Sequence, residues 1–192
     1  MRLLVMIIAL LLAPVAGLAG SEDSLMQGKQ RTGREIVFEA VLDAPPETVY
    51  ELWTTPEGVR SFLAPEARID PVVGGRYEIL FSPGTDPEGE QAGTKGARIL
   101  KMDKGRALAF EWRGAGHMKE MNATPLPTWV ELSFEPVQGE PGKTRLRFAH
   151  LGFGQGGGWD EAYSFFQSAW GGALDSLKKV CAERGKAPAP GG

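Results

Sequence analysis

The last regular segment of the chain, residues 159–184, constrains the fold more than any other feature. Its bulky apolar residues recur at steps of three and four: Trp159, Tyr163, Phe166, Trp170, Leu174, Leu177 and Cys181. This spacing places them on one stripe of an α-helix roughly 39 Å long. Such a stripe needs a broad apolar surface to pack on. The preceding segments have mainly strand character, so the sequence predicts one long helix lying across a curved sheet.

The N-terminal residues have the pattern of an export signal. Arg2 precedes an apolar run over residues 3–12, and Pro14 and several small residues follow it. The run is shorter than the about 20 apolar residues that a membrane-spanning helix needs. We therefore expect a signal peptide over residues 1–19, cleaved after Ala19, and export to the periplasm rather than membrane anchoring.

The rest of the chain is expected to form one domain. A flexible lead-in over residues 20–34 and a disordered Pro/Gly tail over residues 185–192 flank a domain over residues 35–184, which is long enough to bury a core. The net charge of −3 argues against a nucleic-acid partner. Cys181 is the only cysteine, so no intramolecular disulfide can form, and its place on the helical stripe predicts a buried, unreactive thiol.

The predicted order within the domain is a strand, two short helices, about six strands and the long helix. Apolar and polar residues alternate over residues 35–42, which predicts a strand. Pro45 and Pro46 break it and begin a short helix to about Thr54, and Thr54 or Thr55 caps the second helix. Tight turns between the later strands indicate an antiparallel sheet, and therefore the α+β class. These strands are expected at residues 66–71, 76–82, 94–102, 107–113, 129–136 and 144–151.

Four motifs in this order resemble the START-like, or SRPBCC, superfamily, which includes the Bet v 1-like helix-grip proteins. They are LDAPPETVY at 42–50, WTTPEG at 53–58, GGRY at 74–77 and WGGALDSL at 170–177. Within the superfamily, the chain is similar to the activator of heat-shock-protein-90 ATPase homologue (AHSA-like) family over about residues 35–182. The resemblance implies a helix-grip fold, with a curved antiparallel sheet of about six or seven strands, two short helices after the first strand and a long C-terminal helix packed across the sheet.

A cavity is expected between sheet and helix, because a strongly bent sheet and a straight helix cannot close against each other everywhere. Burial of an apolar ligand there would contribute about 25 cal/mol per Å² of apolar surface removed from water. The first hypothesis is therefore an exported, non-enzymatic protein that binds a small hydrophobic or amphipathic molecule. The expected ligand-binding residues are Phe38, Tyr77, Phe81, Phe110, Trp112, Phe148, His150, Phe166 and Trp170.

Two alternatives stay open. One is an enzyme resembling the cyclases of the superfamily, or a hydrolase-like relative, with His150 or Tyr77 as the acid–base group. The sequence holds no nucleophile motif such as GxSxG, so it assigns no catalytic residue. The other is a protein-interaction module resembling the chaperone ATPase activators, which would use a surface and would have a filled core.

Neither a cofactor nor a metal is expected. Residues 152–157 match GxGxxG between a strand and a helix, but no further strand follows to complete a dinucleotide-binding βαβ unit, so we expect a hinge. His117 and His150 lie on separate elements without the ligand spacing of a metal site.

The longest irregular stretch is expected at residues 113–128. Met118 and Met121 would suit contact with an apolar ligand of variable shape, because the thioether side chain adapts to its surroundings. Long loops of this kind are often functional lids, and a plain connector is the equal alternative.

Overall fold

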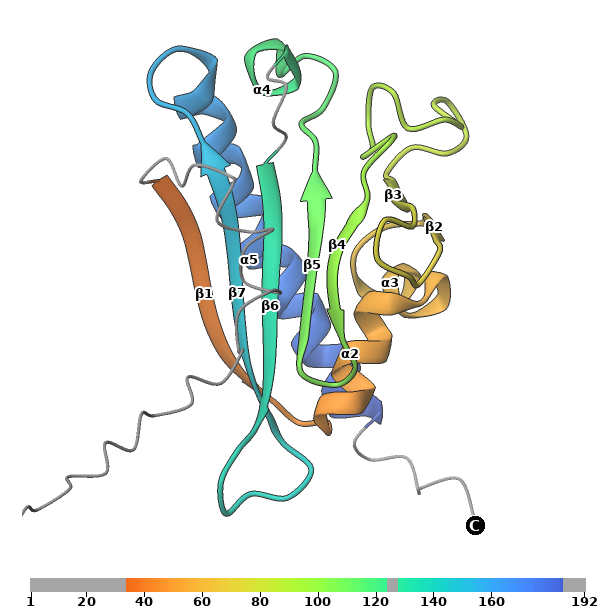
Figure 1. The fold of residues 1–192 in the computed structure, drawn as a ribbon, viewed down its shortest axis with the longest axis vertical. Coiled ribbons are helices and arrows are strands. Elements are labelled where there is room, and N and C mark those ends of the chain that lie inside the picture. Colours follow the sequence, from red (N-terminus) through yellow and green to blue (C-terminus); the bar gives the residue numbers. More distant parts are fainter. Residues whose placement is uncertain (1–33, 124–127, 185–192) are drawn as a thin grey trace, which may run out of the picture.

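The computed structural model describes residues 34–123 and 128–184 (Figure 1). The expected signal peptide over residues 1–19, the lead-in before Arg34 and the tail over residues 185–192 lie outside the described residues. No helix within the described ranges is long and apolar enough to cross a membrane. These ranges follow the predicted order of one strand, two short helices, further strands and one long helix.

Five antiparallel strands form the main sheet, and helix α5 (Gly158–Arg184) lies across one face of it (Figure 1). The strand order is β1-β7-β6-β5-β4. Strands β1, β7 and β6 pair over most of their lengths, so that Phe38, Phe148 and Leu132 lie in one row across the sheet. The strands are β1 (Arg34–Leu42), β4 (Ile99–Asp103), β5 (Ala107–Trp112), β6 (Thr128–Pro136) and β7 (Thr144–Phe153).

Two further strands form a small second sheet beside β4. β2 (Glu66–Ile69) pairs with β3 (Tyr77–Leu80). Two isolated bridges, Arg76 to Arg98 and Leu80 to Gly93, join β3 and the residue before it to the segment that precedes β4. The Tyr77 N–H also donates to the Ala97 carbonyl at 2.9 Å. The described residues therefore hold seven antiparallel strands, which confirms the predicted α+β helix-grip architecture.

For the strand predicted at residues 94–102, the predicted start was wrong, because regular pairing begins only at Ile99. Thr94 takes over the hydrogen bonds that strand backbone would make. Its hydroxyl accepts from the Ile79 N–H at 2.8 Å and donates to the Tyr77 carbonyl at 3.1 Å. A side chain that bonds to neighbouring backbone in this way competes with the regular ladder.

The two short helices follow strand β1 as expected. They are α2 (Pro46–Thr54) and α3 (Pro56–Phe62). Of the two possible caps, Thr55 is the one used, since its hydroxyl accepts from the Gly58 N–H at 3.0 Å.

The stretch predicted as irregular, residues 113–128, contains a short helix in its described part, α4 (Lys119–Ala123). The Asn122 N–H donates to the Met118 carbonyl at 3.1 Å, so one helical turn forms there. The GxGxxG segment provides the connection from β7 into α5, with Gly152, Gly156 and Gly157 at positive φ.

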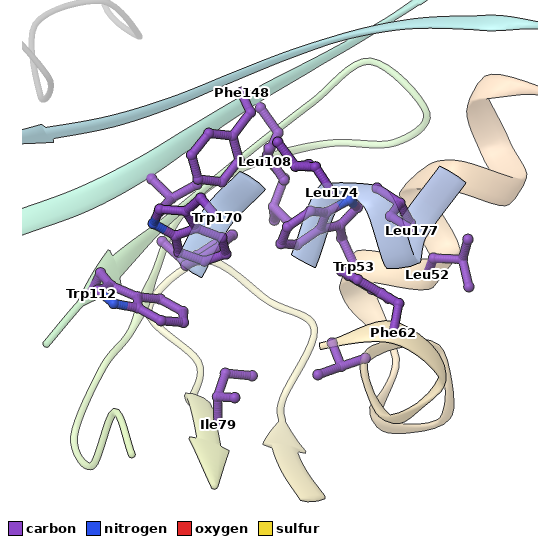
Figure 2. Packing of buried hydrophobic residues seen from close by; sticks show 14 of the residues in the cluster. Leu52, Trp53, Phe62, Ile79, Leu108, Trp112, Phe148, Trp170, Leu174 and Leu177 are labelled. Atoms are coloured by element: carbon purple, nitrogen blue, oxygen red, sulfur yellow. The ribbon is translucent and has the colours of Figure 1, made fainter. Parts of the chain in front are cut away.

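The core is an aromatic and aliphatic layer between the sheet and α5. Five residues of the predicted stripe are buried, and Trp159 and Tyr163 at its beginning are partly buried. Figure 2 shows Trp170, Leu174 and Leu177 of α5 beside Trp53 of α2. The ring of Trp53 lies 4.9 Å from that of Phe62 and 6.4 Å from that of Trp170, which joins the short helices to the long one.

Cys181 lies in this layer and is fully buried, as predicted. Burial raises the pKa of its thiol to about 11. The nucleophilic thiolate is therefore strongly disfavoured in the folded protein.

Candidate functional site

An apolar cavity of about 330 Å³ lies between helix α5 and the part of the sheet around β3 and β5. Phe81 and Phe165 on its lining are 41% and 52% exposed, so the cavity opens at the surface. The lining comes from the end of α3, the ends of the loop between β3 and β4, the end of β5 with the residues after it, and α5. Its residues are Leu63, Phe81, Ala92, Gly93, Trp112, Arg113, Ala115, Phe165, Phe166, Ala169, Trp170 and Ala173.

The cavity exists because small residues face an aromatic wall. Ala169 and Ala173 lie one helical turn apart on α5, and Ala115 follows β5. On the opposite side, a Cβ added to Gly93 would lie 2.7 Å from the Ile79 carbonyl oxygen. The close backbone approach at this point therefore requires glycine, and no side chain is available there to fill the space.

The aromatic wall is continuous. The rings of Trp112 and Trp170 lie 4.6 Å apart, and both side chains are visible side by side in Figure 2. Phe166 and Phe81 flank Trp112 at ring separations of 6.3 and 6.4 Å. Edge-to-face and tilted contacts at these distances are favourable between aromatic rings, so the wall is fixed before any ligand enters.

A hydrogen-bond chain locks this wall to three strands. The Trp170 Nε1–H donates to His150 Nδ1 at 3.0 Å, and His150 Nε2 lies 2.8 Å from Thr128 Oγ1. The Thr128 hydroxyl donates to the Trp112 carbonyl at 3.0 Å. Because an indole nitrogen can only donate, Nδ1 of the neutral ring is the acceptor and Nε2 carries the proton.

His150 is fully buried and neutral in this arrangement. Burial lowers the pKa of its imidazole to about 3. Both ring nitrogens have partners, so His150 orients Trp170 and offers no free nitrogen to a ligand.

Tyr77 is likewise engaged within the protein. Its ring stacks on Phe110 at 3.9 Å, and its hydroxyl donates to the Trp53 carbonyl at 2.8 Å. Burial raises the pKa of the Tyr77 phenol well above its usual value. Tyr77 therefore links α2 to the sheet as a neutral group.

Two residues of the cavity lining carry a side-chain N–H that has no partner in the described part of the chain. The two groups are the Nε1–H of Trp112 and the Nε–H of Arg113, both buried. Among the described residues of the lining, Arg113 alone is charged. Buried donors are normally paired, so these two are exceptions that a bound acceptor could remove.

The side chain of Asn122 holds the backbone that carries Arg113. Its Oδ1 accepts from the Gly114 N–H, and its Nδ2 donates to the carbonyls of Gly114 and Ala115, all at 3.0 Å. A Cβ on Gly114 would lie 2.9 Å from both Met118 Cβ and Met121 Sδ. Helix α4 thus packs closely on the chain after β5 and fixes its course.

Asp86 organises the opposite rim of the cavity. Its carboxylate accepts from the backbone N–H groups of Ala92, Gln91 and Glu90 at 2.7 to 3.0 Å, with Ala92 the strongest contributor to a pKa held below the usual range of an aspartate. The Gly116 N–H donates to the Gln91 carbonyl at 2.8 Å and ties the two rims together.

A second hollow of about 350 Å³ adjoins the first and shares Phe165 with it. It lies where α4 meets the beginning of α5, and its lining is more polar. Lys119, Glu120 and Glu161 are its charged residues, and Met118 and His117 also line it.

The structure separates the nine expected ligand-binding residues into two groups. Phe81, Trp112, Phe166 and Trp170 line the cavity. The remaining five pack elsewhere in the layer between sheet and helix, where Tyr77, Phe110, Phe148 and His150 are fully buried and Phe38 is partly buried against Phe148. Ligand contact by any of the nine stays a prediction.

Several lining residues had no signal in the sequence. Ala92, Gly93 and Ala115 contribute space rather than contacts, and a small residue in a loop does not reveal what it faces. Phe165 lies one position off the buried stripe and was not assigned to the site. Arg113 ends a predicted strand, where a charged residue usually faces water.

Within residues 34–123 and 128–184, no three histidine, cysteine or carboxylate side chains converge as a metal site would require. The expected lack of metal and cofactor stays a prediction.

Comparison with known proteins places this geometry in a family. Residues 43–182 match the sequence model described as Activator of Hsp90 ATPase homolog 1-like protein. No curated protein matches the chain.

Several solved structures share the fold. Protein MLL2253 from Mesorhizobium loti is 22% identical, with a TM-score of 0.62, and the alignment covers 78% of this chain and 98% of that one. The Aha1 dimer from Colwellia psychrerythraea is 20% identical, with a TM-score of 0.61 and coverage of 80% and 99%. An AHSA1-like protein from Aeromonas hydrophila is 19% identical, with a TM-score of 0.55 and coverage of 83% and 100%.

Proposed function

The chain belongs to the Activator of Hsp90 ATPase homolog 1-like family, and from this premise we propose that it is an exported binding protein for a small hydrophobic or amphipathic molecule. The ligand enters the cavity between α5 and the sheet and packs on the aromatic wall formed by Phe81, Trp112, Phe166 and Trp170. The proposal rests on the residues of this chain, since a family name does not determine a ligand.

The observation that carries the proposal is an apolar cavity that stays open in a well-packed domain. Ligand sites are typically concave, mainly apolar and about 300–1,000 Å³ in volume, and this cavity of about 330 Å³ falls at the lower end. Each Å² of apolar surface removed from water there contributes about 25 cal/mol, less the cost of ordering the ligand. The size favours a small ligand rather than a long-chain lipid.

The same geometry speaks against the enzyme alternative in its stated form. His150 and Tyr77 were the candidate acid–base groups, and both are fully buried with their hydrogen-bonding atoms engaged by Trp170, Thr128 and Trp53. Proton transfer requires a group within hydrogen-bond reach of the substrate. The interaction-module alternative needs no cavity, so an open one favours binding.

One mass measurement tests both the cargo and the export. The protein is purified from the periplasmic fraction without added ligand, and its native and denaturing mass spectra are compared. We expect the denatured mass to be that of a chain that begins at Gly20. We also expect a defined extra mass in the native spectrum that disappears on denaturation. A chain that retains residues 1–19 in the cytosol would contradict export, and an unliganded native mass together with no uptake of apolar probes would contradict the binding function.

A further inference from the structure

Arg113 is the feature of the cavity that an apolar ligand alone leaves unexplained. It is the only charged residue on the lining, and it forms no ion pair within the described part of the chain. Its Nε–H is buried and has no hydrogen-bond partner. An arginine at a cavity wall usually meets a carboxylate or another oxyanion, because its planar fork of donors matches two acceptor oxygens.

A second donor lies in the same wall. The Nε1–H of Trp112, the preceding residue, is also buried without a partner. The neighbouring Trp170, by contrast, has its indole N–H satisfied by His150. Two neighbouring residues of the lining, at the end of β5 and just after it, therefore carry an unsatisfied donor.

The charges on the cavity lining agree with an anionic ligand, because no acidic side chain lies among the described residues that form it. Glu120 and Glu161 line the second hollow on the far side of Phe165, together with Lys119. An anionic group is therefore better placed beside Arg113 than in that second hollow.

The backbone that follows Arg113 is held in place by a side chain of α4. Asn122 holds the backbone at Gly114 and Ala115 by three hydrogen bonds. The side chain passes beside Gly96, where an added Cβ would lie 4.0 Å from Arg113 Nε. Backbone that is already held in place loses less conformational entropy when a ligand binds beside it, which favours Arg113 as a ligand contact.

We infer that the cavity binds an amphipathic carboxylate, with its apolar body on the aromatic wall and its carboxylate on Arg113. This inference rests on the proposed binding function and narrows it from small amphipathic molecules in general to anionic ones. The guanidinium supplies charge-assisted hydrogen bonds, and the wall of Trp112, Phe166 and Trp170 supplies apolar contact.

A matched pair of ligands tests the inference. Decanoate and decanol compete at pH 8 with the neutral fluorescent probe N-phenyl-1-naphthylamine for the wild-type protein and for Arg113→Met. We expect decanoate to bind at least tenfold more tightly than decanol to the wild type. Arg113→Met should remove this preference by weakening decanoate binding more than decanol binding, while Arg113→Lys should retain part of the preference.

The outcomes separate the inference from the function on which it rests. Equal affinities for the two ligands, or a preference that survives Arg113→Met, would overturn the inference that the cavity binds a carboxylate. The proposed binding function would still hold if the probe binds. Failure of the probe and both ligands to bind would overturn the two together. A salt series on the wild type needs no variant. Added salt should weaken the binding of decanoate and leave the binding of decanol unchanged, and equal weakening of both would count against a role of Arg113 in binding the carboxylate.

Discussion

At the scale of single residues, His150 shows how one buried polar group can order an aromatic wall. It joins Trp170 on α5 to Thr128 on β6, and Thr128 continues the chain to the backbone of Trp112 on β5. Each side-chain donor and acceptor that forms this series of hydrogen bonds has a partner, so the cost of burying these groups is compensated. The sequence placed His150 correctly on the inward face, but the partners that satisfy its two ring nitrogens lie 20 and 22 residues away in the sequence.

The pH dependence of stability should report this histidine. Its pKa is about 3 when folded and about 6.5 when unfolded, so the unfolded chain binds one more proton between these values. Stability is therefore complete above pH 6.5 and falls with decreasing pH towards 3, by up to about 1.4 kcal/mol per pH unit. We expect the free energy of unfolding of His150→Gln, measured with urea, to lack this decrease between pH 6.5 and 3.

The matched control for that experiment is His117→Gln, at an exposed position before α4. It should keep the acid-dependent slope of the wild type. His150→Gln should also be less stable at pH 8 by about 1–3 kcal/mol, because the flexible amide does not hold an acceptor toward Trp170 and a donor toward Thr128 in the positions of the two ring nitrogens. Identical pH profiles for the wild type and His150→Gln would show that His150 is not the titrating group.

At the scale of elements, α5 was predictable because its stripe repeats over several turns, and its predicted range of residues 159–184 differs from the observed one by a single residue. The short elements were less predictable. Thr94 displaced the start of β4 through side-chain hydrogen bonds, and α4 is too short to show a period. Phe81 follows the inward alternation of β3, yet it lies at the cavity mouth beyond the end of the strand.

Gly171 and Gly172 lie within α5 near the cavity, at positions with no steric need for glycine. An added Cβ at either position meets no atom within 4 Å. Gly172→Ala, on the exposed side, should raise the free energy of unfolding by about 0.5–1 kcal/mol, because alanine has the higher helix propensity. Chemical denaturation measures the change, with Gly171→Ala as its partner variant. A loss of stability would mean that α5 needs glycine here for a reason other than space.

At the scale of the whole molecule, the sequence predicted the architecture and the existence of a gap, but it did not predict where the gap lies. Tyr77, Phe110 and Phe148 were expected to face a ligand, and Trp53 of α2 fills that central space instead. The cavity lies closer to the beginning of α5, where Ala169, Ala173 and the loop glycines leave room. Distances between helix and sheet depend on packing from several elements at once, and no local pattern encodes them.

The central claim is that this cavity takes up a ligand, and filling it is the most direct test. Ala173→Phe places a ring into the cavity from α5, whereas Ser168→Phe adds the same ring on the exposed side of that helix. Fluorescence titration with N-phenyl-1-naphthylamine should show binding by the wild type and Ser168→Phe, and at least tenfold weaker binding by Ala173→Phe, with thermal unfolding confirming that all three are folded. Equal binding by the two variants, or no binding by the wild type, would contradict the account.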